Sequence, residues 1–302
     1  MLATRAGVPT AYVSLNARTV PLNYPQRVYS EIAAGVRVGS VVGLRPLLHS
    51  LLINSATRLK LRDFSSASGG LLAQSIGNLC HYYEENQVFD PHCELLWSLV
   101  LGEDLVWADY TYKRAQALDR IEELSRCFYT VNAGGMILLL DEVETTDQLW
   151  NYKSRLVAYD VMDRLCRFRH LWPVLAITER FTRVVKLDLP RASGNPDFRE
   201  IADLLEGFTT RRFRVVDAPQ LDRAKAIQLA AAVVSLYCAA YPDTKTPNGQ
   251  IDDCVEEWNR NPSKNPRRLI RSVINRLDLL RPLREINLTD MNHCYLSPLP
   301  KK

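Results

Sequence analysis

The hydrophobic pattern of the chain contains one continuous apolar run that ends in carboxylates. Gly134-Gly135 precede the run Met136–Leu140, and Asp141, Glu142 and Glu144 follow it. An uninterrupted apolar run is typical of a strand buried on both faces of a parallel sheet. Ligands of open α/β sheets bind beyond the carboxyl ends of the strands, so these acids stand where a ligand site is expected. A buried strand ending in a solvated acidic turn is the alternative interpretation.

Other short apolar runs predict the remaining strands of the sheet. Val8–Leu15 is expected to be the first strand, and Trp172–Thr178 a second buried strand that ends in a hydroxyl. Phe213–Val216 is predicted to be the last strand, and the basic pair Arg211-Arg212 lies in the turn that precedes it. A helix over 150–169, between two such strands, predicts a right-handed parallel βαβ unit.

Apolar residues spaced three and four apart predict helices along the remainder of the chain. These predicted helices span residues 25–37, 44–61, 71–86, 91–101, 109–132, 196–205, 221–240, 251–259 and 266–280. Ser65–Gly70 is predicted to be a loop because serine and glycine dominate it. Pro190, Gly194 and Pro196 predict an irregular segment over 181–195.

The order of these elements predicts the domain organisation. We expect an α/β fold with a parallel sheet for residues 1–217, interrupted by a helical insertion at about 41–108. From about residue 218 the pattern changes to helices alone. Residues 218–302 are therefore predicted to form an all-α domain, with a loosely packed tail after residue 280.

Composition narrows the class of protein. The chain has 302 residues, of which 47% are hydrophobic and 24% charged, a balance typical of soluble globular proteins. No apolar run approaches the roughly 20 residues that span a membrane, and Met1–Thr10 lacks the apolar core of a secretory signal. We therefore predict a cytoplasmic protein with no membrane partner. The net charge of +4 gives weak support for a nucleic-acid partner.

The cysteines favour reduced thiols over disulfides or a zinc site. There are seven of them, scattered along the chain without a CxxC pair. His81 and His92 lie near Cys80 and Cys93, but their spacing fits no standard zinc pattern. An odd number of cysteines that do not cluster in the sequence is typical of a cytosolic protein.

Taken together, the motifs resemble an AAA+ type P-loop ATPase with its helical lid. Leu138–Glu142 resembles the Walker B element, in which Asp141 would hold Mg²⁺ and Glu142 would orient the attacking water. Thr178 corresponds to sensor one. Asn265–Arg271 resembles the sensor-two helix, in which Arg267, or alternatively Arg268, reaches the nucleotide. The resemblance implies ATP and Mg²⁺ as cofactors.

A narrower resemblance is to the ATP-binding proteins of BREX bacteriophage-defence systems. It rests on Leu15–Tyr29, Leu138–Glu144, Pro219–Tyr241 and Asn265–Arg271. It implies an ATP-hydrolysing subunit of a multi-protein defence complex with DNA as its ultimate target. In AAA+ rings an arginine finger reaches a neighbouring subunit, so Arg211 and Arg212 are candidates for that role and a homo-oligomer is a further expected partner.

The sequence departs from the family in one respect, because it contains no GxxxxGK[ST]. The glycines at 39–43, 69–70 and 134–135 are not followed by the Lys-Ser or Lys-Thr that a phosphate loop requires. In the family this loop precedes the segment that matches Val8–Leu15. We expect that the sequence starts after the loop; otherwise Val8–Leu15 would border an empty position in the sheet. The alternative is a chain that lacks the loop.

Each candidate residue has a simpler alternative role. Asp141 and Glu142 would cap the next helix, since acids favour helix N-termini. Thr178 would satisfy a turn, and Arg267 would lie on a solvated helix. The alternative function is correspondingly a non-catalytic ATPase-like scaffold, or a subunit that binds DNA or protein partners. A third candidate, an origin-binding ATPase, requires a winged-helix domain, for which the residues after Leu280 are too few.

Overall fold

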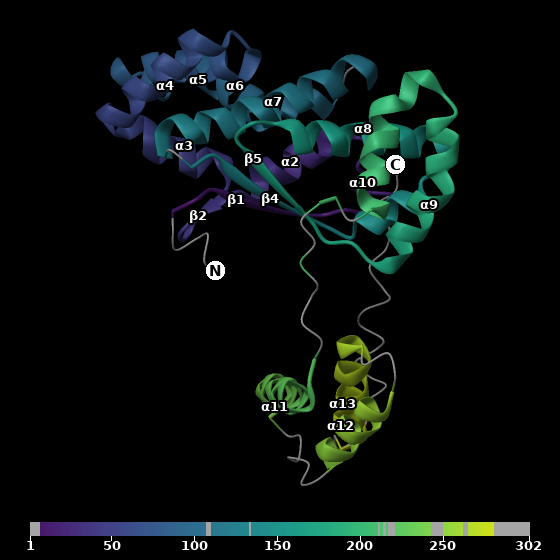
Figure 1. Ribbon diagram of the computed structural model, residues 1–302. Coiled ribbons are helices and arrows are strands. Elements are labelled where there is room, and N and C mark those ends of the chain that lie inside the picture. Colours follow the sequence, from purple (N-terminus) through teal and green to yellow (C-terminus); the bar gives the residue numbers. More distant parts are fainter. Residues whose placement is uncertain are drawn as a thin grey trace, which may run out of the picture. The chain divides into compact units, whose positions relative to one another are not determined.

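The computed structural model divides the chain into two compact units, residues 1–214 and 215–302. The division lies close to the boundary predicted near Asp217. The structure describes residues 7–106, 110–132, 134–210, 212–213, 216, 221–242, 250–261 and 265–280. Figure 1 shows the elements of both units.

The first unit contains a five-stranded sheet in the order β3-β2-β1-β4-β5. The three longer strands run parallel to one another, and β2 and β3 form an antiparallel hairpin beside β1. The prediction of an α/β fold is therefore confirmed, with a mixed rather than wholly parallel sheet. The strands are β1 (Thr10–Ser14), β2 (Arg37–Val38), β3 (Val41–Val42), β4 (Met136–Asp141) and β5 (Leu171–Leu175).

Helices of the first unit pack on one face of this sheet. They are α2 (Pro25–Gly35), α7 (Tyr110–Asn132) and α8 (Tyr152–Arg167), which lie together above the strands in Figure 1. The side chains that point toward these helices are fully buried, among them Ala11, Val13, Met136, Leu138 and Leu140. Alternation of side chains along a strand sends every second residue to the opposite face.

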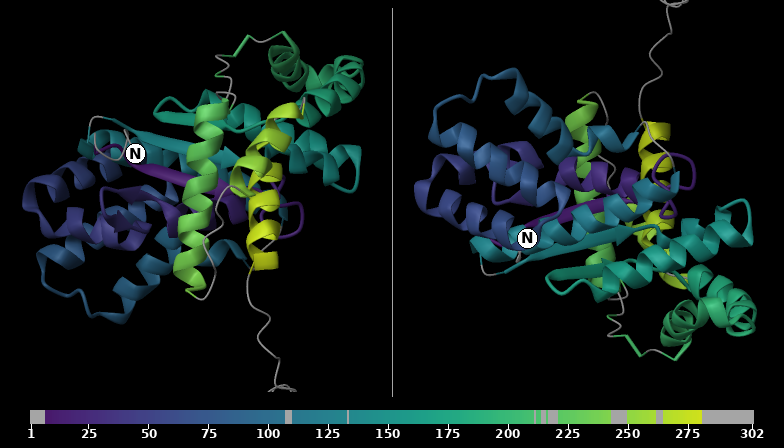
Figure 2. Two further views of the ribbon diagram at one scale, coloured as in Figure 1. Left: turned by 90° about the horizontal axis from the view of Figure 1, so that it is seen from below. Right: turned by 90° about the horizontal axis from the view of Figure 1, so that it is seen from above.

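The opposite face of the sheet is partly exposed, so the prediction that β4 is buried on both faces is wrong. Ile137 and Leu139 are only half-buried, and the neighbouring Tyr12, Trp172 and Val174 are between 45% and 50% exposed. The apolar run therefore reflects one covered and one partly exposed face, because these helices all pack on one side. The strands are visible from below in the left view of Figure 2.

The edges of the sheet also differ from expectation. We predicted that β1 would border an empty position in a chain without a phosphate loop, but the hairpin β2–β3 pairs there through Thr10 and Arg37. Among the described strands, β5 pairs only with β4. Since the Ala176 N–H points toward β4, the backbone nitrogen of Pro173 faces away from it. Proline has no N–H to donate, which suits an edge strand.

Four helices between β3 and α7 form the predicted helical insertion. Two boundaries differ from the prediction. The helix expected over 44–61 is broken at Asn54, whose side chain accepts hydrogen bonds from the Ala56 and Thr57 N–H groups and so caps a new helix. That helix continues to Ser68, which leaves only Gly69-Gly70 of the predicted loop. The elements are α3 (Leu44–Ile53), α4 (Ser55–Ser68), α5 (Leu71–Glu84), α6 (Pro91–Leu101) and the short η1 (Glu103–Val106).

The segment after β5 is more helical than predicted. Residues 181–195, expected to be irregular, form most of α9 (Glu179–Ser193), with η3 (Pro196–Phe198) and α10 (Arg199–Thr209) after it. Phe181, Val185 and Ala192 are buried at helical spacing. Pro190 lies near the C-terminal end of α9, where the helix loses one hydrogen bond but keeps its buried face.

Two predictions about strands are wrong, and part of one of them concerns residues that the structure does not describe. Strand β5 ends at Leu175, so Thr178 is not a strand residue. Phe213 lies in a bend and packs its ring 4.8 Å from that of Phe208, rather than starting a strand. Arg211, Arg214 and Val215 lie outside the described residues.

In the residues that the structure describes, the second unit is a bundle of three helices, which the apolar spacing predicted. It consists of α11 (Arg223–Ala240), α12 (Gln250–Arg260) and α13 (Pro266–Leu280). A small core joins them through Ala226, Ala230, Tyr237, Cys254, Val255, Trp258, Leu269, Val273 and Leu277. The predicted tail after residue 280 lies outside the described residues.

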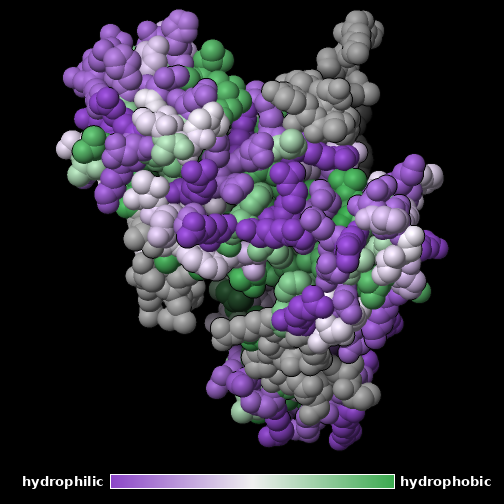
Figure 3. Space-filling model, turned by 45° about the horizontal axis from the view of Figure 1, so that its top comes forward, coloured by the Kyte–Doolittle hydropathy of each residue, from purple (hydrophilic) through white to green (hydrophobic). Residues whose placement is uncertain are grey.

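Helix α11 is long and apolar enough to cross a membrane when only length and composition are considered. Its mean hydropathy is 1.2, and 17% of it is buried. A single helix of this kind is weak evidence for a membrane span. Figure 3 shows hydrophilic residues predominating on the visible surface, with smaller apolar groups between them.

Candidate functional site

The carboxyl ends of β1, β4 and β5 lie side by side and form the edge at which the sequence predicted a ligand site. Ser14 pairs with Asp141 in the parallel register of β1 and β4. On the other side, the Ala176 N–H donates to the Leu140 carbonyl at 2.8 Å. Asp141 therefore ends the middle one of three parallel strands.

The Asp141 carboxylate is held by two hydrogen bonds. Its Oδ2 accepts the Tyr12 hydroxyl at 2.8 Å, and its Oδ1 accepts the Glu142 backbone N–H at 2.8 Å. The hydrogen bond to this carboxylate raises the pKa of Tyr12. Sequence reasoning missed Tyr12, because only the register of β1 against β4 places it near Asp141.

Glu142 has a left-handed backbone conformation, with φ of 57° and ψ of 37°. A side chain in this region costs roughly 1–2 kcal/mol relative to glycine. Non-glycine residues held there cluster at active sites and ligand clamps. The turn is closed by the Thr145 N–H, which donates to the Glu142 carbonyl at 2.9 Å. Nothing in the local sequence indicates this strain.

The simpler alternative, an acid at a helix N-terminus, holds for Glu142 by position but without a capping hydrogen bond from its side chain. Glu142 precedes the short helix η2 (Val143–Gln148), but its side chain makes no capping hydrogen bond. The following helix, α8, is capped instead by Asn151, whose side chain accepts the Ser154 N–H at 2.8 Å. Glu144 lies in the first turn of η2.

Thr178 lies beyond β5, at the N-terminus of α9, and its side chain makes no capping hydrogen bond. Two residues later, Arg180 Nε donates to Asp147 Oδ2 at 2.6 Å, which ties the start of α9 to η2. The other oxygen of Asp147 and the Thr146 hydroxyl are buried and have no hydrogen-bond partner among the residues that the structure describes. These polar groups were not singled out in the sequence.

The donor set at this edge fits Mg²⁺ only as an ion delivered with a phosphate ligand. The part of the chain that the structure describes contains no cluster of three or more His, Cys, Asp or Glu able to hold a metal. Mg²⁺ is usually held by one or two carboxylates together with substrate phosphates and waters. Each Asp141 oxygen keeps a lone pair beside the hydrogen bond that it accepts. Asp141 would therefore hold a nucleotide-bound Mg²⁺, with Glu142 beside it.

The remaining sequence-predicted residues belong to other segments of the chain. Arg267 and Arg268 are exposed in the first turn of α13, in the second unit, where Asn265 Oδ1 accepts the Arg267 N–H at 2.9 Å. Arg212 forms an exposed ion pair of 3.3 Å with Glu206. Arg211 lies outside the described residues.

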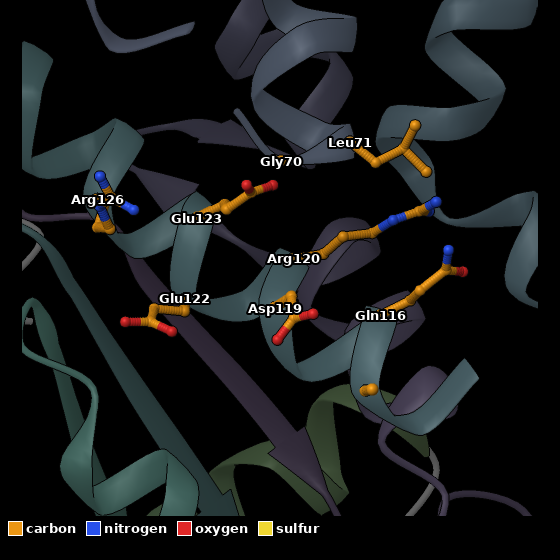
Figure 4. Close-up of a pocket in the computed structure, with 9 residues that line it drawn as sticks. Gly70, Leu71, Gln116, Asp119, Arg120, Glu122, Glu123 and Arg126 are labelled. Carbon is orange, nitrogen blue, oxygen red and sulfur yellow. The ribbon is translucent and has the colours of Figure 1, made fainter. Parts of the chain in front are cut away.

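A cleft of about 420 Å³ lies elsewhere, between α7 and the junction of α4 and α5 (Figure 4). Its deepest charged groups already have partners. Arg120 is paired with both oxygens of Asp104 at 2.7 Å, and the Glu123 carboxylate accepts the Leu72 N–H at 3.1 Å. In Figure 4 the Glu123 side chain points toward Gly70. The cleft therefore has a structural explanation, in which Glu123 caps α5 from another helix.

The buried Glu123 makes a testable contribution to pH-dependent stability. Burial raises the pKa of its carboxyl in the folded protein above the usual 4.5. We expect the free energy of unfolding to fall as the pH rises from below 4.5 through the higher folded-state value, because the folded protein holds this proton more tightly. Urea unfolding of Glu123→Gln at several pH values should show a weaker fall. The same fall in the variant would contradict this assignment.

Comparisons with known proteins identify no relative of this chain. No family model matches it, and neither a curated protein nor a solved structure matches it.

Proposed function

We propose that the edge formed by β1, β4 and β5 binds Mg²⁺-ATP and that the protein is an AAA+-like, ATP-hydrolysing subunit of a BREX-type phage-defence complex acting on DNA. The observation that carries this proposal is the placement of Asp141 and the strained Glu142 directly after the middle parallel strand. Thr178 follows the adjacent strand, as a sensor-one residue would. Glu142 would orient the attacking water.

The backbone strain at Glu142 supports a functional role. Glycine would adopt the same φ without a steric cost, yet the chain has a glutamate there. A carboxylate fixed beside a metal-binding aspartate is the group that positions water in many P-loop ATPases. Arg267, or Arg268, would contact the nucleotide from the lid.

We predict that Glu142→Gln retains ATP binding and loses turnover by about 10²- to 10⁴-fold, the usual contribution of a general base. Glu142→Gly should lose turnover equally and gain roughly 1 kcal/mol of stability, since the left-handed strain is removed. Phosphate release and urea unfolding measure the two effects. Persistent turnover in Glu142→Gln would show that another group orients the water.

The matched control for this pair is Asn86→Gly. Asn86 is the other described non-glycine residue with positive φ, at 56°, and it lies in the helical insertion. Its replacement should leave turnover unchanged and stabilise less, because asparagine tolerates this conformation better. Removal of Mg²⁺ by EDTA should abolish nucleotide binding by the wild-type protein.

A non-catalytic scaffold is the second candidate function. It is favoured by the lack of GxxxxGK[ST] among the 302 residues and by the hydrogen bonds that already engage both Asp141 oxygens. Calorimetric titration with Mg²⁺-ATP separates the two. Binding that is lost in Asp141→Ala supports the ATPase. Absence of binding, with partner or DNA binding retained, supports the scaffold.

The proposed setting follows from the same interpretation. The protein would act in the cytoplasm with other defence proteins, with DNA and with further copies of itself. Arg212, which forms an exposed ion pair with Glu206, would remain a candidate to reach a neighbouring nucleotide.

A further inference from the structure

Aromatic rings gather at the amino-terminal edge of the sheet, opposite the proposed ATP site. The last turns of α7, the turn before β4 and the start of β5 meet there. The Met136 N–H donates to the His170 carbonyl at 2.9 Å, which joins the latter two. Tyr129 on α7 stacks on His170, with ring centroids 3.8 Å apart and planes at 18°.

Trp172, at the start of β5, adds a further ring beside the turn before β4. Its indole lies close to Gly135, so close that a side chain on Gly135 would touch it at 3.0 Å. The side chains of Tyr129 and Trp172 are 45% and 48% exposed. Large aromatic side chains that remain half exposed offer ring faces and edges to a ligand.

Positive charge accompanies the rings. Arg126 lies one turn before Tyr129, and Arg169 precedes His170. Burial lowers the pKa of His170, and the charges of Arg169 and Arg126 lower it further. Neither forms an ion pair with a residue that the structure describes, whereas arginines such as Arg155, Arg167 and Arg180 do.

We propose that Tyr129, His170 and Trp172, together with Arg126 and Arg169, bind single-stranded nucleic acid. Base faces would stack on the exposed rings, and the guanidinium groups would contact phosphates. Single strands are favoured over duplexes because the bases of a duplex are stacked on each other and do not present their faces. This inference rests on the proposed action on DNA, to which it adds a surface that would contact the DNA directly. The surface does not involve the nucleotide site.

The test is fluorescence anisotropy of the full chain with labelled oligothymidylate, without ATP or Mg²⁺. Trp172→Ala should weaken binding by on the order of 5- to 100-fold, the effect of losing one stacked base. Arg169→Ala should reduce the slope of log affinity against log salt by about 0.7. A duplex of equal length should bind more weakly than the single strand.

Trp150→Ala and Arg183→Ala are the matched controls. Trp150 is 95% exposed, Arg183 is exposed in α9, and both lie outside the ring cluster. Arg169→Glu replaces an exposed side chain, so it tests the surface even if Trp172→Ala unfolds. Equal binding by Arg169→Glu and wild type, no binding by wild type, or equal losses in Trp150→Ala would overturn the proposal. Tight binding of polyglutamate with the same dependence on Arg169 and Trp172, together with weak oligothymidylate binding, would instead identify an acidic protein partner.

Discussion

Replacing Gly135 by alanine should destabilise the first unit by about 3–5 kcal/mol, the range of severe core defects. The residue has φ of 67°, and an added Cβ would overlap the His170 carbonyl oxygen. That carbonyl accepts the Met136 N–H, so relief of the overlap would break the start of the β4–β5 pairing. Urea unfolding followed by circular dichroism measures the loss.

Gly39→Ala is the control that separates steric overlap from backbone conformation. Gly39 also has positive φ, at 60°, but no atom lies within 4 Å of the position that its Cβ would occupy. Its replacement should therefore cost only the left-handed penalty of roughly 1–2 kcal/mol. Equal losses in the two variants would mean that the contact with His170 does not matter.

Asp188→Ala should destabilise the protein by roughly 3–5 kcal/mol, because it leaves a largely buried guanidinium without its counter-charge. Asp188 on α9 is 1% exposed and accepts Arg155 Nε at 2.8 Å and Nη2 at 2.9 Å. It also accepts the Tyr159 hydroxyl at 2.9 Å. Both partners belong to α8, so the carboxylate joins the two helices. Thermal and urea unfolding measure the effect.

The exposed pair between Arg164 and Asp119 provides the comparison. Its atoms are 3.7 Å apart, with 40% and 63% of the side chains exposed. Asp119→Ala should change the free energy of unfolding by about 1 kcal/mol or less, since water screens such pairs. If Asp188→Ala cost no more than this, the buried pair would not be what holds α9 against α8.

Much of the secondary structure was predictable because it depends on local pattern. The run Met136–Leu140 predicted β4, and apolar spacing predicted α2, α7, α8 and the helices of the second unit. Prediction failed where a local signal competed with tertiary burial. Pro190 suggested an irregular chain, yet the buried face of α9 outweighs the one hydrogen bond that proline removes.

The candidate site was predictable in part. The pair Asp141-Glu142 follows an apolar run, and such runs end where α/β sheets bind ligands. Nothing in the local sequence predicted the hydrogen bond from Tyr12, which depends on a register across 129 residues. The positive φ of Glu142 could not be predicted either, because nothing in the local sequence indicates it.

The sequence by itself therefore determined most of the helices, the three parallel strands, the α/β character of the first unit and the position of the acidic pair at a strand end. Only the tertiary structure decided which sheet face the helices cover, which strand forms the edge and which rings meet near Gly135. The physical reason is that local periodicity sets the conformation of a segment, whereas packing and strand register join residues that are distant in the chain.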